Sequence, residues 1–113
     1  MPYIAEMTDK PGTTELRAKV RDVHLEYLDA NKAKLLAAGA LLRDDGIGEG
    51  SVYIIDTEDR KTAEAFVAGD PFAKAGLFGR TVIRRWRKAF FNFENCLALR
   101  AMSHKAPPRT LFP

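Results

Sequence analysis

The sequence is poor in the residues that form disulfides and metal sites. Its single cysteine, Cys96, cannot form an intramolecular disulfide and is typical of a reducing compartment. This cysteine and the two histidines show no spacing typical of a metal site, so we expect no bound metal. No apolar run approaches the ~18 residues of a membrane-spanning helix, and the start MPYIAEMTDK lacks the pattern of a signal peptide. We therefore expect a cytoplasmic protein that does not bind membranes.

The charge balance is ordinary except in one basic segment. Of the 113 residues, 46% are apolar and 29% charged, which is typical of one globular domain with a single core. The net charge is +3, and the excess is concentrated in RTVIRRWRK, residues 80–88. Lysine and arginine are common on edge strands, where they block unwanted pairing. We therefore interpret this segment as a charged edge strand and expect no binding to nucleic acid.

Turn residues and apolar periodicity divide the chain into strands and helices. The predicted elements are a strand over 2–8, a helix capped by Thr14 or Thr13 that runs to about Ala38 and is ended by Gly39, strands over 40–45 and 51–56, a helix capped by Thr57 or Asp59, a helical turn over 71–75 and a strand over 78–88. This β-α-β-β-α-β order predicts an α+β fold of the ferredoxin-like class with an antiparallel sheet.

The third predicted strand, SVYII, is apolar on both faces. Val52 and Ile54 point one way, and Tyr53 and Ile55 point the other way. Both helices cover the same face of a ferredoxin-like sheet, so another layer of protein must cover the apolar side chains of the other face. A second copy of the chain is the simplest choice, and we expect a homodimer.

Asp70 opens the motif GDPF, which is typical of a helix start. Its carboxylate would cap free backbone N–H groups, and Pro71 suits the first helical position. His24 lies on the apolar side of the first predicted helix, and the fold allows Asp70 to approach it. A carboxylate bonded to one imidazole nitrogen makes the other nitrogen a better base. A buried histidine is more often a simple core residue, and periodicity alone leaves both interpretations open.

Several segments together resemble the YCII family. They are DKPG (9–12), Arg17 and Arg21, HLEYL (24–28), AAGALLRDD (37–45), GSVYII (50–55), GDPFAKAGLF (69–78) and RTVIRRWRKAF (80–90). The resemblance covers residues 1–90 and implies a dimeric α+β barrel with a catalytic pair at His24 and Asp70. Residues 91–113 remain as a C-terminal extension that packs on the domain or on the partner subunit.

Because of this extension, the chain most resembles the dehydrochlorinase branch of the family. That branch eliminates chloride from a chlorinated hydroxyhydroquinone and gives a hydroxybenzoquinone, a step of aromatic degradation. The resemblance implies a lyase that acts by general base catalysis on a small aromatic substrate, without a cofactor.

A flat aromatic substrate requires apolar walls and a few polar anchors. Candidates for the walls are Phe72, Phe78, Tyr53 and Trp86. The two serines of the chain, Ser51 and Ser103, are candidate hydroxyl anchors. From position alone, each serine is equally consistent with a turn or a solvated tail.

Three other functions remain open. The RNA recognition module has the same element order, but its third strand carries several aromatic residues, whereas GEGSVYII has one and PYIAEM adds only Tyr3. Small tautomerases use an N-terminal proline, which Pro2 becomes if Met1 is removed, although Pro2 is also a normal start for an edge strand. A ligand-binding or accessory domain is the third alternative, because a fold does not determine function.

The segment AFFNFENCLALRAMSHKAPPRTLFP (89–113), which contains the C-terminal extension, is too apolar for a solvated tail. Its large apolar residues are Phe90, Phe91, Phe93, Leu97 and Leu99. We expect it to close one side of the pocket, with Ser103 near the substrate and His104 as a weaker candidate for the same role. A segment that only stabilises the dimer explains the composition equally well.

Overall fold

The computed structural model describes residues 1–97. Its elements are β1 (Tyr3–Asp9), α1 (Thr14–Ala30), the 3-10 helix η1 (Lys32–Lys34), β2 (Leu35–Leu42), β3 (Gly48–Ile55), α2 (Arg60–Gly69), α3 (Pro71–Lys74), β4 (Phe78–Arg85), β5 (Phe90–Phe91) and β6 (Glu94–Asn95). Four strands form an antiparallel sheet in the order β2-β3-β1-β4. This is the ferredoxin-like arrangement, so the predicted fold class is confirmed.

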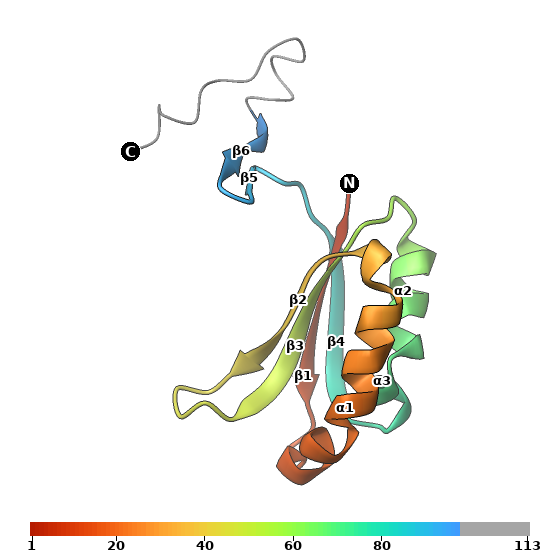
Figure 1. The fold of residues 1–113 in the computed structure, drawn as a ribbon, viewed down its shortest axis with the longest axis vertical. Helices are drawn as coiled ribbons and strands as arrows, with labels where there is room; N and C mark the ends of the chain where they lie inside the picture. Colours follow the sequence, from red (N-terminus) through yellow and green to blue (C-terminus); the bar gives the residue numbers. More distant parts are fainter. Residues whose placement is uncertain (98–113) are drawn as a thin grey trace.

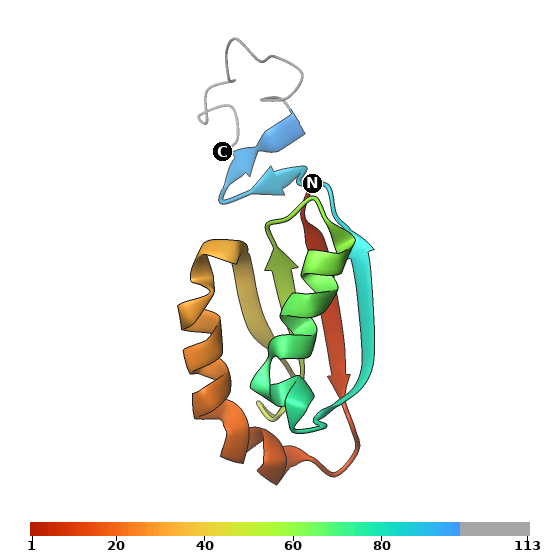
Figure 2. The ribbon, with the colours of Figure 1, turned by 90° about the vertical axis from the view of Figure 1, so that its right-hand side faces the viewer.

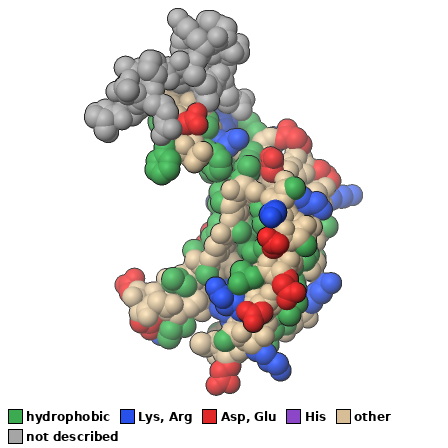
Figure 3. All heavy atoms as spheres, in the orientation of Figure 1, with side chains coloured by type: hydrophobic (Ala, Val, Ile, Leu, Met, Phe, Trp, Pro, Cys, Tyr) green, Lys and Arg blue, Asp and Glu red, His purple; other side chains and the backbone are tan. Residues whose placement is uncertain are grey.

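The helices cover one face of the sheet and leave the other face open (Figures 1 and 2). The open face is hollowed between the tip of the β2–β3 hairpin and the β5–β6 segment (Figure 3). A cavity of about 320 Å³ on this face is lined by Ile4, Glu6, Thr8, Arg80, Val82 and Arg84.

Strand β3 is apolar on both faces, as predicted. Tyr53 and Ile55 are fully buried beneath the helices, together with Met7 of β1. Burial of a side chain such as Ile55 contributes about 1.5–3 kcal/mol. Val52 and Ile54 alternate to the open face, where they are only partly buried. The core therefore lies on the helix side, and the open face retains apolar side chains.

The first helix is shorter than predicted. It ends at Ala30 instead of about Ala38, and β2 occupies residues 35–42 instead of 40–45, so Gly39 lies inside a strand. At the end of the helix, Asn31 donates both its backbone N–H and its side-chain amide to the carbonyl of Tyr27. The apolar run that follows pairs with β3, and this long-range pairing overrides the local helical pattern.

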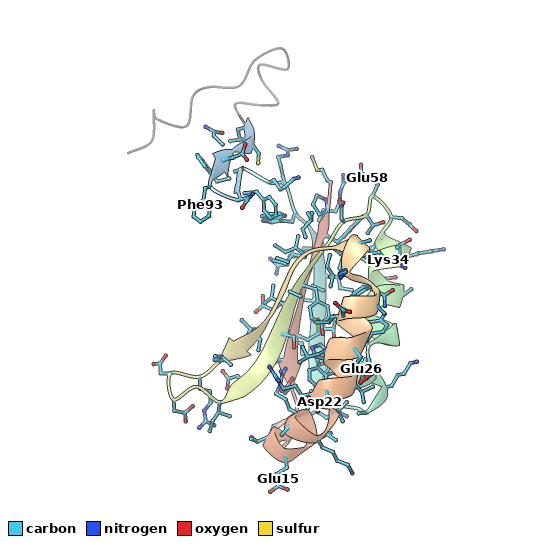
Figure 4. All side chains as sticks on the ribbon, in the orientation of Figure 1. Glu15, Asp22, Glu26, Lys34, Glu58 and Phe93 are labelled. Carbon is cyan, nitrogen blue, oxygen red and sulfur yellow. The ribbon has the colours of Figure 1, made fainter. Side chains whose placement is uncertain are left out.

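The extension begins with a small hairpin that the sequence did not predict. β5 pairs with β6 through Asn92 and Phe93, whose φ angles are 53° and 66°. Two successive positive φ angles are typical of a tight hairpin turn, but its usual signal is Asn-Gly rather than Asn-Phe. The Phe93 side chain projects outward from the hairpin and is 87% exposed (Figure 4). The predicted roles of Ser103 and His104 lie outside the described residues.

Candidate functional site

His24 and Asp70 meet in the interior between α1 and the sheet. The Nδ1 atom of His24 lies 2.9 Å from Oδ1 and 3.0 Å from Oδ2 of Asp70. His24 is 6% exposed, and Asp70 is fully buried. The predicted contact between the two residues is therefore confirmed.

Asp70 lies at the junction of α2 and α3, where it also caps a helix. Its Oδ1 atom accepts the backbone N–H of Phe72 at 2.8 Å, and Pro71 occupies the first turn of α3. A capping bond of this kind contributes about 1 kcal/mol. The predicted capping role is confirmed, and the cap fixes the carboxylate in the orientation that faces His24.

Tyr53 of β3 completes the environment of the carboxylate. Its hydroxyl donates to Oδ2 of Asp70 and lies 3.5 Å from Nδ1 of His24. Burial raises the pKa of Tyr53 far above its ordinary value, and the hydrogen bond to Asp70 raises it further. The phenol therefore keeps its proton and acts as a donor.

The donors around Asp70 determine the tautomer of His24. A carboxylate accepts hydrogen bonds only, so in the neutral imidazole this contact places the proton on Nδ1 and the lone pair on Nε2. Within residues 1–97, Nε2 has no hydrogen-bond partner, and every fully buried side-chain nitrogen or oxygen in that range has one. Nε2 is therefore reachable from solvent, as a general base must be.

The ring of Phe72 supports this arrangement. It is fully buried and stacks on the imidazole of His24, with centroids 3.8 Å apart and planes 13° apart. The rings of Phe72 and Phe78 pack edge to face, with their centroids 6.1 Å apart. Phe72 therefore contacts His24 directly, and Phe78 approaches it through Phe72. Their predicted part in substrate binding stays a prediction.

Arg17 belongs to the same site, although sequence reasoning gave it no role. Its guanidinium carbon lies 4.7 Å from the Phe72 centroid. Its Nε atom donates to Asp9 at 2.6 Å, and Nη2 donates to the Gly50 carbonyl at 2.7 Å and to the Ser51 hydroxyl at 2.9 Å. Arg17 precedes His24 by two helical turns, and that spacing is the signal that could have identified it.

The other predicted residues differ in position. Ser51 is 2% exposed and accepts from Arg17, so it lies near the site, but its predicted substrate contact stays a prediction. Trp86 follows β4, and its ring contacts Phe91 of the β5–β6 hairpin. Ser103 lies outside the described residues.

The helix-side face of β2 is exposed next to the site. Ala38 pairs with Tyr53 and Ala40 pairs with Ser51, so both alanines point to the helix side. Both are exposed, whereas their partners on β3 are buried. The small side chains of this strand therefore lie exposed beside the buried Tyr53 and Ser51.

Residues 1–97 contain no group of three or more His, Cys, Asp or Glu residues placed to hold a metal ion. None of the helices in this range combines the length and apolar character needed to span a membrane.

Comparison with known proteins identifies relatives over most of the chain. Residues 1–87 match the model of the YCII-related domain. A Haemophilus influenzae protein described as uncharacterized is 32% identical over 98 residues, which cover 80% of this chain and 100% of that protein. Protein YciI of Escherichia coli O6:H1 is 30% identical with the same coverage of both chains.

A solved structure is also similar. It is 5-chloro-2-hydroxyhydroquinone dehydrochlorinase (TftG) from Burkholderia phenoliruptrix AC1100 in complex with 2,5-dihydroxybenzoquinone. The identity is 36% and the TM-score 0.71, over 77% of this chain and 94% of that chain. Since the family model matches most of the sequence and two relatives are at least 30% identical over 80% of it, the chain belongs to the YCII-related domain family.

Proposed function

We propose that this protein is a lyase that eliminates chloride from a chlorinated hydroxyhydroquinone and releases a hydroxybenzoquinone. The observation that carries the proposal is the hydrogen bond between His24 Nδ1 and Asp70, which leaves Nε2 as an accessible base. The similarity to TftG supports the reaction class, because that protein is a dehydrochlorinase of a substrate of this type.

The reaction needs only proton transfers and a leaving group. Nε2 of His24 takes the proton of one ring hydroxyl, and the ring carbon that bears chlorine gains a proton, which gives a keto tautomer. The hydroxyl para to the new carbonyl then loses its proton, and chloride leaves with the electron pair of the C–Cl bond. One molecule of HCl is lost and the ring ends as a quinone, so no external oxidant is required.

Asp70 and Tyr53 assist without touching the reacting ring. When Nε2 gains a proton, His24 becomes a cation, and the carboxylate of Asp70 stabilises that charge at 2.9 Å. The Tyr53 hydroxyl holds the second oxygen of Asp70 and prevents the carboxylate from rotating. The pair is therefore oriented before substrate binds, which removes a reorganisation cost from the barrier.

The substrate ring is proposed to lie over β2, beside α1. Ala38 and Ala40 provide a flat, exposed surface next to the buried Tyr53 and Ser51. Phe72 and Phe78 provide apolar contact from the side of His24, and Ser103 is proposed as a further anchor.

We also propose that the protein is a homodimer that pairs through the open sheet faces. Val52 and Ile54 are apolar and only partly covered there. The hairpin residues Phe90 and Phe93 are 60% and 87% exposed, so their own domain does not bury them. A second copy placed against the hollow face would cover both sets of side chains.

The proposed activity is tested with the purified full chain and 5-chloro-2-hydroxyhydroquinone under exclusion of oxygen. Chloride release and the quinone absorbance should appear together and in equal amounts. The control is the His24→Gln variant, which keeps a polar side chain but has no base of this strength. Equal rates for the two proteins, or no turnover by the wild type, would refute the proposal.

The described residues do not favour an RNA recognition module or a tautomerase that uses Pro2. Tyr3 and Tyr53 are buried on the helix side, so they cannot stack bases on the open sheet face, as an RNA recognition module requires. Pro2 is buried, and its carbonyl accepts the N–H of Trp86, which is consistent with an edge-strand start.

A further inference from the structure

Arg17 is held in a fixed orientation by groups that leave part of its guanidinium uncommitted. Nε and Nη2 contact Asp9, Gly50 and Ser51. Nη1 makes no hydrogen bond to any residue of the described range, in which every fully buried side-chain nitrogen or oxygen has a partner. Nη1 is therefore accessible to a ligand, while the rest of the side chain is anchored.

Arg17 and His24 rest on the same aromatic ring. The imidazole stacks on Phe72 with centroids 3.8 Å apart, and the guanidinium carbon lies 4.7 Å from the same centroid. Both side chains also have one ring or guanidinium nitrogen that reaches solvent. His24 and Arg17 thus lie around one aromatic ring, and each has a nitrogen that a ligand can reach.

The position of Gly48 keeps Nη1 uncovered. A Cβ atom at this position would lie 3.1 Å from Cδ and 3.7 Å from Nη1 of Arg17. The first of these distances is tighter than almost all real Cβ contacts, so Arg17 would have to shift by a few tenths of an ångström to accommodate a side chain there. Glycine at residue 48 thus provides the space that the guanidinium occupies.

We propose that Arg17 binds an ionised ring oxygen, and that the site selects planar hydroxyquinone anions over neutral phenols. This proposal rests on the proposed function, since it assigns a ligand contact within the same site. A hydroxyl on a quinone is a vinylogous acid whose negative charge is shared between two oxygens through the ring. A planar guanidinium pairs well with such a delocalised oxyanion, because its N–H groups lie in one plane. Asp9 and Ser51 are positioning residues that hold Arg17.

The test measures binding instead of turnover, so it is independent of the elimination chemistry. 2,5-Dihydroxybenzoquinone, which is anionic at neutral pH, and uncharged hydroquinone are titrated into the full chain. Arg17→Gln should raise the Kd of the anionic probe by about 10- to 100-fold, the effect of one charge-assisted hydrogen bond, and leave the Kd of hydroquinone unchanged.

Two further variants separate this effect from misfolding. Arg17→Gln leaves the Asp9 carboxylate without its partner, so the double variant Asp9→Asn/Arg17→Gln removes both charges. Gly48→Ala keeps both charges but shifts the Arg17 side chain and places a methyl group beside Nη1, so it should also weaken binding of the anionic probe. Gly39→Ala is the matched control, because a Cβ at residue 39 meets no atom within 4 Å.

The outcomes distinguish the two proposals. If the wild type binds the anionic probe and Arg17→Gln and Gly48→Ala bind it equally well, the role of Arg17 is wrong and the proposed function stands. If Arg17→Gln raises the Kd of both probes to the same extent, Arg17 has only a structural role and the proposed selectivity is wrong. If the wild type binds neither probe, both proposals fail. Arg17-dependent binding without chloride release would support the ligand class and refute the elimination reaction.

Discussion

The Nδ1 atom of His24 lies 2.9 Å from a carboxylate of Asp70 that also receives the hydroxyl of Tyr53 and the backbone N–H of Phe72. These three donors come from a helix, a strand and the start of another helix, so the carboxylate cannot move without breaking contacts in three elements. The single proton acceptor left in this network is Nε2 of His24. A fixed network of this kind produces a base of defined orientation.

Asp70→Asn should lower the rate of chloride release strongly while the protein stays folded. The amide oxygen can still cap α3, but the amide cannot stabilise the imidazolium or hold its tautomer. We expect a loss on the order of 10²- to 10⁴-fold in kcat. Steady-state kinetics measures the loss, and circular dichroism checks the fold. His24→Ala should abolish turnover, and a His24→Ala variant with a near-normal rate would contradict the mechanism.

Tyr53 should make the protein sensitive to alkali. Its pKa is raised in the folded state, so above pH ~10 the unfolded chain loses this proton while the folded chain keeps it. The unfolded state then binds fewer protons, and the free energy of unfolding falls as pH rises above ~10, by up to about 1.4 kcal/mol per pH unit. Below pH ~10 the contribution is constant.

Urea denaturation between pH 8 and 11 tests this dependence. Tyr53→Phe should cost about 1 kcal/mol at pH 8, because Asp70 loses a donor, and should reduce the slope above pH ~10. Part of the slope should remain, since burial and the charge of Asp70 also raise the pKa of Tyr27. An unchanged slope in Tyr53→Phe would contradict the assignment.

Filling the exposed surface of β2 should block the substrate without disturbing the base. Ala38→Leu places a larger side chain next to Tyr53, where the substrate ring is proposed to lie. We expect KM to rise by on the order of tenfold or more, as a bulky group removes several contacts of the ring. Ala65→Leu, at an exposed position of α2, is the matched control and should behave as the wild type. Equal KM values for both variants would place the substrate elsewhere.

Local patterns predicted the elements that depend on local interactions. The start of α3 at Pro71 and the cap of α2 at Asp59 follow from residue types that act over two or three positions. The end of α1 was wrong because LLAA suits a helix or a strand, and pairing with β3 decides between them. Val23 of α1 is 54% exposed, so this helix is less deeply buried than its apolar pattern indicates.

The candidate site was predictable only where a motif marked it. Asp70 stands in GDPF and His24 lies on an apolar stripe, but their contact joins residues 46 positions apart and needs the fold. Arg17 was named only as part of the family resemblance, and nothing but its spacing to His24 indicated a place in the site. Its contacts with Asp9 and Ser51 depend on the approach of α1 to β1 and β3, which no short pattern encodes.

Val52→Asp should disrupt the proposed dimer. Val52 lies on the open sheet face opposite Glu6, and a charge there cannot be buried against a second copy. Light scattering at micromolar concentration should find a dimer for the wild type and monomers or aggregates for the variant. Val52→Lys is a second variant that places a charge on the same face. Because its lysine can pair with Glu6, it tests the cost of burying a charge without repulsion from that carboxylate. A stable wild-type monomer would contradict the dimer, and Val23→Asp, at an exposed helix position, should leave it intact.

Removing the end of the extension should show whether the extension closes the site during catalysis or only stabilises the dimer. Phe90 and Phe93 of the hairpin are 60% and 87% exposed and Leu97, which follows it, is 47% exposed, so this segment has apolar surface left for a partner or for the substrate side of the site. If the extension excludes water from the reacting ring, truncation after Met102 should lower kcat/KM by on the order of tenfold with dimer stability unchanged. Ser103→Ala should show part of the same loss if its hydroxyl contacts the ring. Phe93→Ser, which changes only the hairpin, should instead weaken the dimer. A truncated protein that keeps the full rate but dissociates more easily would show that the extension serves assembly and not catalysis.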